Sequence, residues 1–106
     1  YYEFIRGSVG EEIASFDGAF CSNDLIGFAL CRFLRERGIS VPQDFKVVGF
    51  DNTLFTQTVI PRLTTISQNI PQIAQVLVET LLAMQEDSAP RGVTMLDVKL
   101  IQGETT

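Results

Sequence analysis

Polar side chains that could bind a small molecule follow two apolar stretches of this 106-residue chain. Asn23 and Asp24 come directly after "AFCS", and Asp51 and Asn52 come directly after "FKVVGF". A carboxylate offers hydrogen-bond acceptors, and a carboxamide offers both donors and acceptors. The hydroxyl groups of a sugar match that set, and a hydrogen bond from a hydroxyl to the Asp51 carboxylate would contribute about 1.5–3 kcal/mol.

Local structure offers a second explanation for each of these two clusters. Asn23 or Asp24 is a good N-cap for a helix that begins beside it. Asp51 and Asn52 are residue types that commonly build turns. The two clusters therefore indicate a ligand only if the fold brings them to one place.

A strand-helix-strand unit would bring the two clusters together. Residues 19–22 and 45–50 predict strands, and the continuous apolar run of the second is typical of a parallel strand covered on both faces. Residues 24–37 predict a helix that ends at Gly38. Such a unit is right-handed by default, and ligands collect beyond the carboxyl ends of adjacent parallel strands. We therefore expect the two clusters to share one edge of a sheet.

The helix predicted at residues 24–37 is apolar on more than one face. One row, expected in the core, comprises Ile26, Leu30, Phe33 and Leu34. A second row comprises Leu25, Phe28 and Arg32. A helix of this kind is either enclosed in a core or shared with a partner.

The remaining segments complete an α/β pattern. Residues 63–67 and 93–101 predict strands, and residues 70–85 between them predict a second amphipathic helix with Asn69 as its N-cap. The apolar stripe of this helix, which we expect to be buried, comprises Ile73, Val76, Leu77, Thr80, Leu81 and Met84. Residues 1–16 predict a helix interrupted by glycines.

Composition excludes several kinds of function. The net charge of −5 argues against this chain itself gripping a phosphate backbone. The absence of histidine excludes histidine acid–base chemistry and most zinc sites. Cys21 and Cys31 have apolar neighbours and are interpreted as buried reduced thiols, which is consistent with a reducing compartment. No apolar run is long enough to span a membrane, and the charged residues 1–16 are not a signal peptide.

An enzyme is the weaker alternative. A lone aspartate after an apolar strand, such as Asp51, can act as a nucleophile or phosphoacceptor. Such sites also need further acidic residues for a metal and a well-placed lysine. Lys46 lies inside a predicted strand and Lys99 is far along the chain, so we expect neither catalytic residues nor a metal or cofactor.

Three motifs, "FCSNDLIGFAL", "GISVPQDFKVVGFDN" and "PRLTTISQ", follow one another in one order. With them the chain resembles the effector-binding core of the lactose/galactose-repressor (LacI/GalR) family over about residues 17–106, and several spaced motifs are specific evidence. The resemblance implies a type I periplasmic-binding-protein-like fold, an α/β effector domain with a parallel sheet and two lobes. Residues 1–67 would belong to the C-terminal lobe, 69–96 would cross into the N-terminal lobe, and 97–106 would return. Without the rest of the N-terminal lobe, the helix at 70–85 would expose its apolar stripe. The DNA-binding helix-turn-helix would lie upstream, outside this chain.

The resemblance also implies the residues that contact the effector. Asn23 matches the Asn of the family's "ND" motif, Asp51 the first Asp after "VG-aromatic", and Gln68 the Gln at the crossing between lobes. Asn52 departs from the commoner Asp-Asp form, which puts a second acidic role at that position in doubt.

The family dimerises through its C-terminal lobe, which implies a second surface. It would be formed by the helix at 24–37 and by residues 53–60, which predict a short helix or an irregular turn. The residues assigned to it are Leu25, Phe28, Arg32, Phe55 and Val59. The alternative is that the apolar ones are ordinary core residues.

The function implied by the resemblance is allosteric. A small-molecule effector, sugar or sugar-like, would bind between the lobes of a cytoplasmic homodimer and change how upstream helix-turn-helix heads bind operator DNA. The alternative is a periplasmic sugar-binding protein that serves a transporter or chemoreceptor. A signal peptide or a helix-turn-helix upstream of Tyr1 would distinguish the two.

Overall fold

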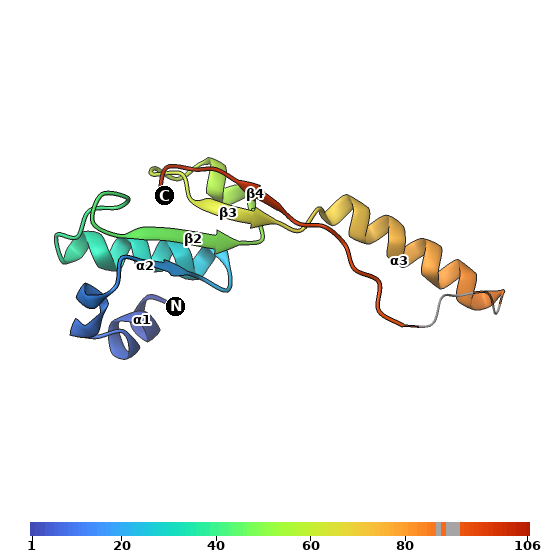
Figure 1. The fold of residues 1–106 in the computed structure, drawn as a ribbon, viewed down its shortest axis with the longest axis horizontal. Helices are drawn as coiled ribbons and strands as arrows, with labels where there is room; N and C mark the ends of the chain where they lie inside the picture. The colour runs from blue at the N-terminus through green and yellow to red at the C-terminus, as the bar shows by residue number, and fades with distance from the viewer. Residues whose placement is uncertain (87, 89–91) are drawn as a thin grey trace.

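The structure is a computed structural model that describes residues 1–86, 88 and 92–106, apart from the side chains of Glu11 and Gln57. The helices are α1 (Tyr2–Ser8), α2 (Asp24–Glu36) and α3 (Ile70–Gln85), with short 3-10 helices at η1 (Glu11–Ser15) and η2 (Leu54–Gln57). The strands are β1 (Gly18–Phe20), β2 (Lys46–Phe50), β3 (Thr64–Ser67) and β4 (Lys99–Ile101). Figure 1 shows a lobe built around the sheet and a separate arm that carries α3.

The described strands form one sheet in the order β1-β2-β3-β4. β1, β2 and β3 run parallel, whereas β4 pairs antiparallel with β3. Ala19 pairs with Val47, and Gly49 pairs with Thr65. The predicted parallel β1–α2–β2 unit and the α/β class are confirmed.

The core lies between α2 and the sheet, with Phe33, Leu34 and Val47 fully buried. Leu30 is buried as well, and Ile26 is partly buried, so the predicted core row of α2 is confirmed. Glycine allows this close packing. A Cβ atom added to Gly27 would lie 2.9 Å from the Leu63 side chain.

The C-terminal residues close the lobe. The buried Thr105 bridges β2 and β3, because its hydroxyl donates to the Val47 carbonyl at 2.6 Å and accepts from the Thr64 amide at 2.9 Å. The Val47 amide in turn donates to the Thr105 carbonyl at 2.8 Å. A Cβ atom on Gly103 would lie 2.4 Å from the Arg62 carbonyl oxygen, so the chain passes there only as glycine.

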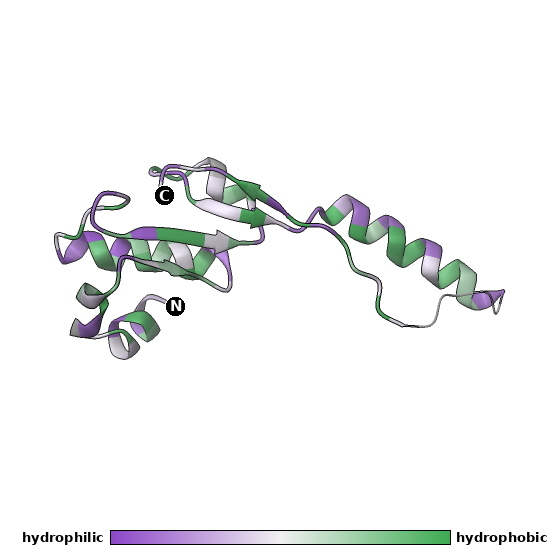
Figure 2. Ribbon diagram, in the orientation of Figure 1, coloured by the Kyte–Doolittle hydropathy of each residue, from purple (hydrophilic) through white to green (hydrophobic). Residues whose placement is uncertain are grey.

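The arm makes the molecule elongated, with extents of 59 × 25 × 20 Å. Its radius of gyration is 17.9 Å, against about 13 Å for a compact chain of this length. The apolar stripe of α3 is exposed, as predicted for this chain without the rest of the N-terminal lobe. No side chain of α3, all of whose residues are described, is buried, and Leu77, Leu81 and Met84 are each about 60% exposed. Figure 2 shows apolar residues along this isolated helix.

Two local predictions around the arm need correction. Only Lys99–Ile101 of the predicted strand 93–101 pairs with a neighbour, because β3 has only four residues and Ser67 already lies opposite Lys99. Asn69 stands at the N-cap of α3, but its side chain makes no capping hydrogen bond. The Asn69 backbone is left-handed, with φ at 53°, and its side-chain amide donates to Gln72 instead.

The N-terminal region agrees with the prediction of an interrupted helix. α1 ends at Ser8, and Gly10, with φ at 50°, separates it from η1. Gly7 lies inside α1 without interrupting it. Residues 53–60, predicted as a short helix or irregular turn, contain the short 3-10 helix η2.

Candidate functional site

The carboxyl ends of β1, β2 and β3 lie at one edge of the sheet, as predicted for the polar clusters. Beyond β1 the Cys21 amide donates to the Val48 carbonyl at 2.7 Å, and beyond β2 the Asp51 amide donates to the Ile66 carbonyl at 2.9 Å. Asn23, Asp51 and Gln68 therefore each follow a strand at the same edge of the lobe.

Asp51 and Gln68 are in direct contact. The side-chain amide nitrogen Nε2 of Gln68 donates to Oδ1 of Asp51 at 2.6 Å, and both residues are half-buried. Within the described part of the chain, the second carboxylate oxygen of Asp51 has no hydrogen bond. One acceptor of Asp51 is thus held by the chain, and the other is available to a ligand.

Asn23 acts as the N-cap of α2. Its backbone is extended and its Oδ1 oxygen accepts from the Ile26 amide at 2.9 Å. Of the two capping candidates, Asn23 is therefore the cap, whereas the fully buried Asp24 makes other contacts. Capping uses only the oxygen of the Asn23 carboxamide, and its amide donors have no partner among the described residues, so they remain available.

A hollow of about 660 Å³ lies beside Asp51, within the size range of small-molecule sites. It is lined by Asp51, Asn52, Ser67, Asn69, Ile70, Pro71, Gln72, Asp97, Val98 and Lys99. Asp51, Asn52, Ser67 and Lys99 come from the lobe, Ile70, Pro71 and Gln72 from the first turn of α3, and the others from the two connections between them. Asn23 and Gln68 are not among the lining residues.

Sequence reasoning missed Asp97 and Lys99, which introduce a second carboxylate and an ammonium group at this hollow. Both belong to a segment separated from Asp51 by more than forty residues. They approach it only because β4 pairs with β3, and no local sequence signal marks them.

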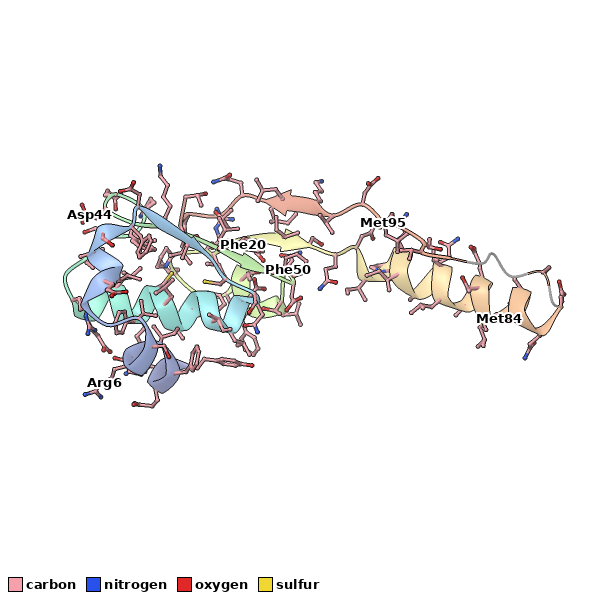
Figure 3. All side chains as sticks on the ribbon, turned by 60° about the horizontal axis from the view of Figure 1, so that its bottom comes forward. Arg6, Phe20, Asp44, Phe50, Met84 and Met95 are labelled. Carbon is pink, nitrogen blue, oxygen red and sulfur yellow. The ribbon has the colours of Figure 1, made fainter. Side chains whose placement is uncertain are left out.

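Two aromatic rings stand at the ends of the first two strands. Phe20 and Phe50 pack edge to face, with ring centroids 6.3 Å apart and an angle of 86° between the planes. Figure 3 shows these two rings together at the end of the sheet. Phe20 remains 65% exposed. An exposed aromatic pair beside polar strand ends adds an apolar surface to this edge.

Three of the five residues assigned to a dimer surface line one hollow. Phe28, Arg32 and Val59 line a hollow of about 420 Å³, to which Leu25 and Phe55 do not contribute. Leu25, Phe55 and Val59 are exposed, whereas Phe28 packs partly against the core. An intrachain ion pair already holds Arg32, whose Nε lies 3.0 Å from Glu36.

Charge at the surface of α2 is organised around Glu36. The Tyr2 hydroxyl donates a hydrogen bond to this carboxylate, and the Arg32 guanidinium lies 4.4 Å over the Tyr2 ring. The hydrogen bond from Tyr2 and then that from Arg32 hold the pKa of Glu36 below its ordinary value. These contacts attach α1 to α2.

Both cysteines carry free thiols. Burial raises the pKa of Cys21 and that of Cys31 to about 11. Both side chains are therefore neutral thiols at pH 7. Cys21 is buried as predicted, whereas Cys31 is only half-buried.

Among the described residues, no group of three or more histidine, cysteine, aspartate or glutamate residues is arranged to hold a metal ion. None of the helices in the described ranges is both long and apolar enough to cross a lipid bilayer.

Comparison with known proteins places this geometry in context. The family profile described as "periplasmic binding protein-like domain" matches residues 5–106. The sucrose operon repressor of Streptococcus mutans is 34% identical over 89 residues, which cover 84% of this chain and 28% of the repressor. The lactose operon repressor of Escherichia coli is 35% identical over 85 residues, covering 80% of this chain and 24% of the repressor. The chain thus spans about a quarter of the length of these relatives.

The structure agrees with the sequence comparison. A lac repressor dimer, solved bound to operator and to the anti-inducer ONPF, superposes with a TM-score of 0.89 at 30% sequence identity. The match covers 99% of this chain and 36% of that one. The arm with α3 is therefore part of the shared fold, because the superposition includes nearly the whole chain.

Proposed function

The chain belongs to the periplasmic binding protein-like family, within the LacI/GalR group, and we propose that it is the sugar-binding and dimerisation region of a transcriptional regulator. The observation that carries this proposal is the Asp51 carboxylate, which is held by Gln68 and faces a hollow between the lobe and the connections to α3. The names of the relatives, repressors of sugar operons, support a sugar as the effector.

The chemistry of the hollow suits a ligand with several hydroxyl groups. Asp51 offers a free acceptor oxygen, and Asn52 and Gln72 add carboxamides that both donate and accept. Asn23, at the same edge, has free amide donors. The predicted effector contacts Asn23, Asp51 and Gln68, with Asn52 and Gln72 added by the hollow, would hold the sugar at the edge of the lobe.

The connections to α3 provide the route for allosteric coupling. In the proposed division, residues 1–67 and 97–106 belong to one lobe and residues 69–96 to the other, of which 87 and 89–91 lie outside the described residues. A sugar in the hollow would touch both connections and restrain α3 relative to the sheet. Couplings of this type are worth about 1–3 kcal/mol and are reciprocal, so operator DNA would change sugar affinity by the same factor.

The relatives are transcriptional repressors rather than enzymes, and we propose the same role for this protein. It would act as a cytoplasmic homodimer and bind operator DNA through a helix-turn-helix elsewhere in the protein. The repressor relatives favour this role over that of a periplasmic solute receptor. The acidic chain itself is unsuited to hold DNA, because its net charge is −5.

The proposed sugar site is tested in the full-length protein by calorimetric titration with sucrose, lactose and their component monosaccharides. Asp51→Asn keeps the shape of the side chain but removes its charge, and we expect it to weaken binding of the recognised sugar by roughly tenfold or more. Asp17→Asn, which changes an exposed carboxylate before β1, is the matched control and leaves affinity unchanged. Equal affinity of the Asp51→Asn variant and the wild type would refute the role of Asp51.

Asn23 needs a variant that separates its two roles. Asn23→Asp keeps an oxygen that can cap α2 but removes the amide donors. We expect an unchanged melting temperature and weaker sugar binding. A direct contact between Asn23 and the sugar is contradicted if the variant loses both melting temperature and sugar affinity, or if it loses neither.

The proposed dimer surface is tested by sedimentation of the full-length protein at micromolar concentration. Val59→Arg places a charge on an exposed apolar residue of the 420 Å³ hollow, so it leaves the fold intact and separates the subunits. Phe4→Arg, at an exposed residue of α1 outside this surface, remains dimeric. A dimeric Val59→Arg variant would show that the interface lies elsewhere.

A further inference from the structure

We infer that Asp24 and Thr65 are positioning residues that fix the backbone turn carrying Asp51, and hence the direction of its carboxylate. This inference rests on the proposed sugar site at Asp51. Asp24 and Thr65 are both completely buried, so neither is accessible to a ligand.

The turn after β2 has an unusual backbone. Asp51 has φ at 108° and Asn52 has φ at 53°, two consecutive positive values without a glycine. Side-chain-bearing residues avoid this region, and they remain in it only where surrounding contacts over-determine the conformation. Some part of the structure must therefore hold residues 51 and 52 in place.

A chain of hydrogen bonds surrounds this turn. The Asn52 amide donates to the Thr65 hydroxyl at 3.3 Å, and that hydroxyl donates to Oδ1 of Asp24. The other oxygen of Asp24, Oδ2, accepts from the Thr53 amide at 2.7 Å. The buried Asp24 carboxylate thus fixes the backbone after Asp51 in two ways. It holds the Thr53 amide directly, and it holds the Asn52 amide through the Thr65 hydroxyl.

Close packing against Gly49 leaves the Asp24 carboxylate little freedom. Thr65 lies opposite Gly49 in the sheet, and a Cβ atom on Gly49 would lie 2.5 Å from Oδ1 of Asp24. The carboxylate therefore occupies the space that a side chain at position 49 would fill. On the other side of the turn, the Asp51 amide donates to the Ile66 carbonyl at 2.9 Å.

The consequence concerns the direction of the Asp51 side chain. With its present backbone, Asp51 reaches Gln68 and lines the hollow. Relaxation to the ordinary negative φ range would rotate the Cα–Cβ bond and aim the carboxylate elsewhere. Removal of the hydroxyl of Thr65 should therefore weaken sugar binding without touching the sugar.

The test compares two neighbouring threonines of β3 in the full-length protein. Thr65→Val removes the hydroxyl within the turn network, whereas Thr64→Val removes an equally buried hydroxyl that bonds to Gly103 and Thr106 on the other side of the lobe. Both variants lose hydrogen bonds and some stability. The ligand is whichever of sucrose, lactose and their component monosaccharides the wild type binds. We expect only Thr65→Val to weaken its binding, by roughly tenfold. Thr65→Ser, which keeps the hydroxyl, restores the affinity.

A second measurement does not depend on any sugar. Hydrogen exchange of the Asn52 and Thr53 amides reports the turn directly, and we expect faster exchange there in Thr65→Val but not in Thr64→Val or Thr65→Ser. Unchanged exchange in Thr65→Val overturns the inference, and so does a loss of sugar affinity that is equal in Thr64→Val. If exchange changes as expected while the wild type binds none of the sugars, the positioning of the turn is upheld and the proposed sugar site fails.

Discussion

The helices α2 and α3 carry similar apolar patterns and have opposite surroundings. α2 buries Leu30, Phe33 and Leu34 against the sheet, whereas α3 leaves Leu77 and Leu81 about 60% exposed. Both begin after an asparagine, but only Asn23 makes a capping hydrogen bond. In Figure 1 α2 lies along the sheet and α3 stands away from it.

This difference separates two properties that an amphipathic pattern is often taken to predict together. The pattern determines that a helix forms, because local propensity and spacing decide it. Burial requires a complementary surface from elsewhere in the fold, and the described residues provide one only for α2. The described residues leave the apolar stripe of α3 exposed, and contiguous apolar surfaces of this kind can mark interaction sites.

The largest expected effect comes from truncating one apolar residue on each helix. Phe33→Ala should lower the free energy of unfolding by about 3–5 kcal/mol, because it leaves a cavity in a fully buried site. Leu81→Ala should change it by less than about 0.5 kcal/mol in this chain, since Leu81 is 60% exposed. Urea denaturation followed by circular dichroism measures both.

The variants Phe33→Ala and Leu81→Ala can also be compared in the full-length protein. If α3 packs into a second lobe there, Leu81→Ala becomes strongly destabilising while the effect of Phe33→Ala is unchanged. An equally small effect in both contexts would show that the stripe of α3 stays exposed.

Glycine substitutions distinguish the closed interior of the lobe from its surface. Gly103→Ala should destabilise by about 1–3 kcal/mol, because the new Cβ atom collides with backbone atoms of Arg62, Leu63 and Thr64. Gly7→Ala, in α1 with no atom within 4 Å of the added Cβ, should instead stabilise by about 0.5–1 kcal/mol. Thermal unfolding of the two variants gives the signs, and a neutral Gly103→Ala would mean that the C-terminal residues do not close the lobe.

High pH should lower the free energy of unfolding of the lobe, because both cysteines lie there. α3 has no cysteine and should not contribute to this effect. Burial raises the pKa of Cys21 and Cys31 from 9.0 to about 11. Their contribution to stability is therefore complete below pH 9 and is lost as the pH rises toward 11. The loss is at most about 1.4 kcal/mol per pH unit for each thiol. A Cys21→Ala/Cys31→Ala variant should show a shallower pH dependence above pH 9, and equal slopes would contradict burial as the cause.

The smallest expected effect separates the two N-caps. Asn23→Ala should cost about 1 kcal/mol because it removes the hydrogen bond to the Ile26 amide. Asn69→Gly should change stability by less than about 0.5 kcal/mol, since no capping bond is lost and glycine tolerates the positive φ of 53°. Matched urea titrations measure the two costs, and a larger cost at Asn69 would reverse the assignment of the caps.

Local sequence signals were sufficient for much of the fold. The apolar run before Asp51, the cap at Asn23 and the row of Leu30, Phe33 and Leu34 each depend on residues close in the chain. Together they predict the parallel strand-helix-strand unit, which the structure confirms. The roles of Asn23, Asp51 and Gln68 remain predictions, although the contact between Asp51 and Gln68 supports them.

The sequence by itself determined where helices and strands form and which polar residues stand at strand ends, because these follow from spacing and local conformational preference. Only the tertiary structure decided which polar groups are enclosed and which apolar stripe is covered. Asp24 is buried because Thr65, 41 residues away, supplies its hydrogen bond, and Thr105 is buried because it bridges Val47 and Thr64. α3 is exposed because burial is a property of a pair of surfaces, and the described residues supply only one of them.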